Sequence, residues 1–167
     1  MNRVQTCCAC LLALLCFTTL HLACKGSSAP PRIVIEDIWS RPVLIDVDLS
    51  SRGAAKVEEQ PWSSNGVVYL RIRNDGGTSD RLLAAKSTVC KATEIHITVV
   101  EGEVMSMHRL HEGLEIAAGA VAEFEPGAAH LMLLGLTRSL KPGDRFEVTL
   151  QFEKSGQMTV VSQVQKP

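Results

Sequence analysis

The sequence predicts a single all-β domain, and three observations carry that prediction. Short runs rich in Val, Ile, Leu and Thr recur along the chain at a spacing typical of β-sandwiches and barrels, about 8–12 residues. Gly, Pro, Asn and Asp separate these runs, and no long segment has the apolar period of an amphipathic helix. A length of 167 residues is enough for one domain with its own core.

The expected strands follow one another through the second part of the chain. Alternation is clearest in 145–153, where Phe146, Val148, Leu150 and Phe152 fall on one face. The segment 43–64 has no such period and is expected to be a loop or insertion. Strands are expected at 32–37, 66–74, 90–100, 104–110, 145–153 and 157–165, with two or three more within 113–136.

The N-terminus predicts export. Arg3 is followed by an apolar stretch over 10–23, which is too short to span a bilayer and fits a secretory signal. It ends in Leu22-Ala23-Cys24, which resembles a bacterial lipobox, so Cys24 is the candidate for lipidation; a soluble, cleaved product is the alternative. We therefore expect a signal peptide at 1–23, a flexible tether at 24–31 and a folded domain at 32–167. The protein is expected to be a periplasmic lipoprotein that contacts the membrane only through its lipid anchor.

Composition argues against several functions. A net charge of −1 and only seven aromatic residues (two Trp, one Tyr, four Phe) give no basis for nucleic-acid binding. Of six cysteines, only Cys90 stays in the domain after export, so no disulfide is expected there and Cys90 is expected to be a small hydrophobic residue. The sequence offers no pairing of a nucleophile with a base, so we do not expect an enzyme.

One strand carries an unusual pair. In "PGAAHLMLLGL", alternation puts Leu131 and Leu133 on one face, and His130 and Met132 on the other. A hairpin about residues 101–103 would place His96 opposite about residue 108, close to Met107. Imidazole and thioether together suit a soft metal such as Cu(I), whereas ordinary filling at a sheet margin is the plain alternative.

From residue 32 onward the chain resembles a known family. "TEIH", "GEVMSM", "GLEIAAGAVAEFEPGAAHLMLLGL" and "LKPGDRFEVTLQFEKSGQMTV", with "IEDIWSRP" and "NGVVYLRIRNDGG" before them, are similar in order to the periplasmic copper chaperones of the PCuAC type. That resemblance implies a cupredoxin-like Greek-key β-sandwich holding Cu(I) through an H-x10-M-x21-H-x-M pattern. Ten residues separate the first pair here and 22 the second, one more than the pattern. The implied ligands are His96, Met107, His130 and Met132, with Met105 and His108 as auxiliary candidates.

The resemblance implies an exported copper metallochaperone that binds one Cu(I) and delivers it to a copper-accepting protein. The family suggests that the recipient is a respiratory oxidase copper centre or one of its assembly factors. Two alternatives stay open at this point. One is an exported β-sandwich lipoprotein that binds another protein and no metal, and the other is a blue-copper electron carrier, which would need Cys90 as its thiolate ligand.

Overall fold

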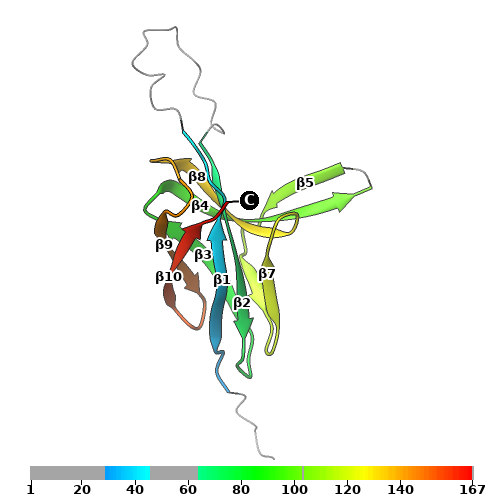
Figure 1. The fold of residues 1–167 in the computed structure, drawn as a ribbon. Coiled ribbons are helices and arrows are strands. Elements are labelled where there is room, and N and C mark those ends of the chain that lie inside the picture. Colours follow the sequence, from blue (N-terminus) through cyan, green and yellow to red (C-terminus); the bar gives the residue numbers. More distant parts are fainter. Residues whose placement is uncertain (1–28, 46–63, 103, 167) are drawn as a thin grey trace, which may run out of the picture.

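The protein folds as an all-β sandwich, which confirms the fold class expected from the sequence (Figure 1). The computed structural model describes residues 29–45, 64–102 and 104–166. Within these ranges there is no helix, and hence none long and apolar enough to cross a membrane. The described residues form ten strands: β1 (Ile33–Ser40), β2 (Gly66–Asn74), β3 (Asp80–Ser87), β4 (Cys90–Glu101), β5 (Val104–Arg109), β6 (Leu114–Ile116), β7 (Val121–Phe124), β8 (Ala129–Leu136), β9 (Arg145–Phe152) and β10 (Gln157–Val164).

The ten strands hydrogen-bond into one mixed sheet that folds over on itself. Its order is β5-β4-β8-β7-β2-β1-β10-β9-β3-β6, and β8 also pairs with β2. β1 runs parallel to β10, and β7 runs parallel to β8. β3 packs against β4 although the two strands lie far apart in this order, so the sheet closes into two layers. The crossover from β2 to β3 is a connection of the Greek-key kind.

The space between the layers is filled by aliphatic and phenylalanine side chains. The face of β9 expected to be buried is buried, because Phe146, Val148, Leu150 and Phe152 are at most 6% exposed. In β8, Leu131 and Leu133 are completely buried in the core. The residues that alternate with these leucines are therefore directed to the other face of β8, which is the face of the candidate site.

β3 has no counterpart among the strands expected from the sequence. Its register shifts between Leu82 and Ala84, which leaves Leu82 in the core and Leu83 43% exposed. This bulge interrupts the alternation by which a strand is recognised. From the expected loop at 43–64, Val43 forms a bridge with Leu140, and residues 46–63 lie outside the described part of the chain.

Residues 29–32, which we call the N-terminal strap, are bound to the turn that follows β2. The backbone N–H of Arg32 donates to Asn74 Oδ1 at 3.1 Å, and the Arg32 guanidinium lies 2.9 Å from Asp75 Oδ2. The backbone of Ala29 accepts a hydrogen bond from Gly77. The last residues of the expected tether thus lie against the domain.

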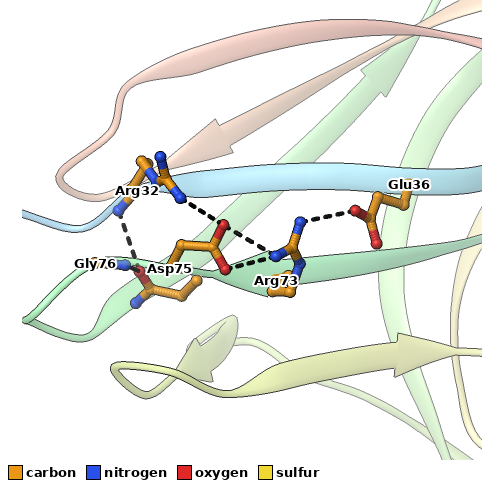
Figure 2. Close-up of polar contacts among 6 residues, drawn as sticks. Arg32, Glu36, Arg73, Asp75 and Gly76 are labelled. Atoms are coloured by element: carbon orange, nitrogen blue, oxygen red, sulfur yellow. Dashed lines mark hydrogen bonds and ion pairs between the residues drawn. The ribbon is translucent and has the colours of Figure 1, made fainter.

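The same turn carries a small charged network (Figure 2). Arg73 bridges Asp75, at 2.8 Å, and Glu36 of β1, at 2.9 Å. Gly76 is required beneath the strap because a Cβ there would stand 2.3 Å from the carbonyl oxygen of Pro30. One ion pair, hydrogen bonds and close backbone packing therefore attach the strap to one end of the sandwich.

Candidate metal site

The candidate site is built on β8, between β4 on one side and β2 on the other. His96 of β4 is the direct cross-strand partner of His130, and the centroids of the two rings are 5.8 Å apart. Met132 lies opposite Glu94 of β4 and Val67 of β2. Cross-strand partners point to the same side of a sheet, so the two histidines and Met132 share one face.

β5 extends this face beyond β4. Met107 is the partner of Thr98, and Arg109 is the partner of His96. Met105 lies two residues from Met107 on the same strand and so has the same orientation. In Figure 1 the β4–β5 hairpin extends away from the other strands, so these methionines lie on a projecting part of the sheet.

The observed hairpin register differs by one residue from the expected one. His96 pairs with Arg109, not with His108, because Glu101 pairs directly with Val104 at the tip. A shift of one residue exchanges the two faces of a strand. The observed register is the one that puts Met107 on the face of His96 and turns His108 away from it.

The shared face opens into a pocket of about 370 Å³. Three thioethers and one imidazole line it, and the Tyr69 ring, which packs on Trp39 with centroids 4.7 Å apart, forms part of its wall. The lining residues are Met105, Met107, His130, Met132, Val67, Tyr69, Thr98 and Gly127. Of the four ligands expected from the sequence, three line the pocket.

The two sides of the pocket differ in exposure. His130 is only 6% exposed, and Met132 beside it is half-buried. On β5, Met107 is 59% exposed and Met105 is 64% exposed. One side of the site is thus fixed in the sheet, whereas the other side is open to solvent.

His130 is held in a defined orientation. Its Nδ1 lies 3.2 Å from the carbonyl oxygen of Ala128, which can only accept, so Nδ1 carries the proton and Nε2 keeps the lone pair. The same carbonyl accepts the backbone N–H of Thr98. Burial, supported by the nearby charge of His96, lowers the pKa of His130 against the opposing effect of the Ala128 carbonyl. The neutral imidazole that a metal needs is therefore favoured.

His96 lies beside the pocket rather than in its lining, and one of its nitrogens is unsatisfied. Its Nε2 is 2.9 Å from Glu94 Oε2, whereas its Nδ1 is buried without a hydrogen-bond partner. An unsatisfied buried nitrogen costs about 1–3 kcal/mol. A metal ion would satisfy this nitrogen, and two imidazoles with thioethers form a donor set that suits Cu(I).

The other residues named from the sequence lie elsewhere. His108 is on the opposite face of β5, with its Nε2 2.9 Å from Ser106 Oγ. Cys90 is buried in the core, six residues from His96 along β4, a separation of about 20 Å in an extended strand. Its thiol is therefore too far from the pocket to be a ligand there. Cys24 lies outside the described residues.

Two polar residues of the site were not found from the sequence. Glu94 binds His96 through one oxygen and Arg109 through the other, at 2.5 Å. The spacing of Glu94 and His96, two residues apart on one face of a strand, was a usable signal for their contact. The contribution of Arg109 depends on the hairpin register, which the sequence did not predict correctly.

The fold is that of the PCuAC domains, a class of β-sandwich. The copper-bound PCuAC domain from PmoF2 matches with a TM-score of 0.57 at 23% identity, over 83% of this chain and 97% of that domain. The solution structure of CuI-DR1885 from Deinococcus radiodurans matches with a TM-score of 0.55 at 18% identity, over 84% of this chain and 83% of the other. These matches confirm the family resemblance at the level of the fold.

The chain belongs to the family described as "Putative lipoprotein LpqE-like", whose model matches residues 33–164. "Putative lipoprotein Lxx21020" of Leifsonia xyli subsp. xyli is 31% identical over 81 residues, which are 48% of this chain and 49% of that protein. The match thus spans about half the length of that relative. "Uncharacterized protein RP573" of Rickettsia prowazekii is 28% identical over 157 residues, 84% of this chain and 87% of the other.

Proposed function

We propose that the protein is an exported copper chaperone that binds one Cu(I) ion through His96, Met107, His130 and Met132. One observation carries the proposal: the sheet register brings these four side chains, from three strands, to one face. The cargo is Cu(I) rather than zinc, because thioethers are soft ligands and zinc favours thiolate, imidazole and carboxylate. The PmoF2 domain, which shares this fold and is copper-bound, supports the same assignment.

The difference in exposure across the pocket suits a cargo that is passed on. His130 and Met132 lie in the central strand β8, whereas Met107 lies on the exposed edge strand β5. A partner's ligand approaching from solvent would displace the Met107 thioether first, while the histidines still hold the ion. Transfer by stepwise ligand exchange in this way never releases free copper.

We propose further that the protein acts outside the cytoplasm as a lipoprotein anchored through Cys24. The apolar segment at 10–23 and the family description support export and lipidation. The partner is a copper-accepting protein, and the resemblance to the PCuAC chaperones favours a respiratory oxidase copper centre or its assembly factors. Transfer exchanges coordination bonds to the ion and changes no covalent bond, so the proposal involves no enzymatic activity.

The test is an anaerobic titration of the purified protein with Cu(I) in the presence of a chelator that competes for the ion. We expect one equivalent of copper per chain, and X-ray absorption that shows both sulfur and nitrogen neighbours. His130→Ala removes a pocket ligand and lowers the affinity. His111→Ala, at an exposed histidine outside the pocket, is the matched control and leaves the affinity unchanged.

Two outcomes would contradict the proposal. If the protein binds no copper under these conditions, it is not a chaperone for this metal, and an exported protein-binding sandwich becomes the better interpretation. If copper binds equally well to the His130→Ala variant, the ion lies at another place and the ligand set is wrong.

A further inference from the structure

We infer that Glu94 is a positioning residue that fixes which nitrogen of His96 is available to the metal. Glu94 holds Nε2 of His96, which leaves Nδ1 as the nitrogen that would bind Cu(I). The inference rests on the proposed function for the effect on Cu(I) affinity, whereas the His96 tautomer is a property of the protein without metal.

The hydrogen-bond chemistry of Glu94 determines the His96 tautomer. A carboxylate has no proton to give, so in the 2.9 Å contact between Glu94 Oε2 and His96 Nε2 the ring nitrogen is the donor. A neutral imidazole carries one proton, and with Nε2 protonated the lone pair lies on Nδ1. Nδ1 is also the buried atom that has no partner in the described structure.

Arg109 keeps Glu94 in this arrangement. Its Nη1 donates to Glu94 Oε1, so each oxygen of the carboxylate has its own donor. The Glu94 side chain is 18% exposed and that of His96 is 16% exposed, whereas Arg109 is half-exposed. The ion pair therefore closes the solvent side of a partly buried carboxylate and limits its rotation.

The two histidines then present different nitrogens. The Ala128 carbonyl holds Nδ1–H of His130, which leaves Nε2 for a metal, whereas Glu94 holds Nε2–H of His96, which leaves Nδ1. Each ring has its second nitrogen bound by a fixed oxygen. Such outer partners orient metal ligands, and their loss typically costs about 10–100-fold in metal affinity.

The first experiment needs no copper. Long-range ¹⁵N–¹H spectra of the ¹⁵N-histidine-labelled protein report the tautomer of each ring. We expect the Nε2–H tautomer for His96 and the Nδ1–H tautomer for His130 in the metal-free protein. In Glu94→Ala, we expect His96 to become a mixture of tautomers while His130 stays unchanged.

The second experiment measures Cu(I) affinity by chelator competition. We expect Glu94→Ala to weaken binding by about 10–100-fold. Glu94→Gln, whose amide oxygen can still accept from Nε2–H, should retain more affinity and the same tautomer. Glu115→Ala is the matched control, because Glu115 also pairs with an arginine, Arg81 at 3.0 Å, but on the β3–β6 edge of the sheet.

The two readouts separate this inference from the proposed function. If the protein binds no Cu(I), the proposed function fails and the metal-free spectra still decide whether Glu94 positions His96. If copper binds and Glu94→Ala changes neither the His96 tautomer nor the affinity, the inference is wrong and the chaperone proposal stands. An equal loss of affinity in Glu115→Ala would also overturn it.

Discussion

Replacing the thioethers at Met107 and Met132 by leucine separates copper binding from folding. Leucine has about the same volume and apolar character as methionine, so a buried swap usually costs less than about 1.5 kcal/mol. Met132 is half-buried, and that limit applies to it. Met107 is 59% exposed, so its replacement should stay within about 0.5 kcal/mol. The double variant should therefore lose less than about 2 kcal/mol and remain folded, since domains are commonly stable by about 5–15 kcal/mol.

The double variant should lose more in Cu(I) affinity than in stability. Two of four proposed ligands are lost and leucine offers no donor, so we expect a drop of about 100-fold or more, which is at least about 2.7 kcal/mol of binding energy. Urea unfolding without metal measures the stability, and competition with a Cu(I) chelator measures the affinity. Added Cu(I) should raise the melting temperature of the wild type more than that of the double variant.

Met158→Leu is the control for this substitution. Met158 is a partly buried methionine on β10 that packs against the core and does not line the pocket. It should tolerate leucine without any change in copper affinity. If the Met107→Leu/Met132→Leu protein keeps wild-type affinity, or if Met158→Leu weakens binding to the same extent, the thioethers of Met107 and Met132 are not the copper ligands. Met105→Leu shows in addition whether the third thioether of the pocket takes part.

Four further outcomes are expected. Protonation of His130 should weaken Cu(I) binding only below its ordinary pKa of 6.5, because burial lowers that pKa and protons compete with the metal for this ring only near the lowered value. Chelator competition across pH, in the wild type and in His130→Ala, measures this contribution. Burial alone would raise the pKa of Asp80, but hydrogen bonds from the Ser155 side chain and from backbone N–H groups bring it below 3.8. The stabilisation by the Asp80 carboxylate is therefore full above pH 3.8 and is lost as the pH falls through the lowered pKa. Asp80→Asn should cost about 1–3 kcal/mol at neutral pH and remove this acid dependence. Urea unfolding at neutral pH and at a pH below the lowered pKa measures both effects. Cys90→Ser should leave the copper affinity unchanged in the same chelator assay, and a large loss would indicate a thiolate site. Cys24→Ala should release the protein from the membrane fraction, and a wild type that is already soluble would refute the anchor.

Alternation along β8 was predictable because it depends only on the period of a strand. Leu131 and Leu133 are fully buried in the core, and Met132 lines the pocket on the other face. The same rule identified the buried face of β9. Neither result needed any knowledge of which strands are neighbours.

The pairing between strands was harder to predict from the sequence. The hairpin register was wrong by one residue because it depends on the tip, where Glu101 pairs with Val104. The period of each strand could not reveal the cross-strand pairing of His96 with His130, since strands 90–100 and 129–136 are neighbours only in the folded sheet. β3 was missed because a bulge at Leu82 and Ala84 breaks its pattern. Local periods can be found in one sequence, whereas registers and bulges depend on contacts between distant segments.

The N-terminal strap has a consequence for the height of the pocket above a bilayer. With lipid on Cys24, only five peptide steps separate the anchor from Ala29, a reach of at most about 18 Å. The strap fixes the domain by its end at residues 74–77. β2 runs from that end to Val67 in the pocket wall, about 23 Å along the strand. Copper bound as proposed would thus lie at the end of β2 opposite the lipidated terminus, where a recipient whose copper-accepting domain projects from the membrane could approach it.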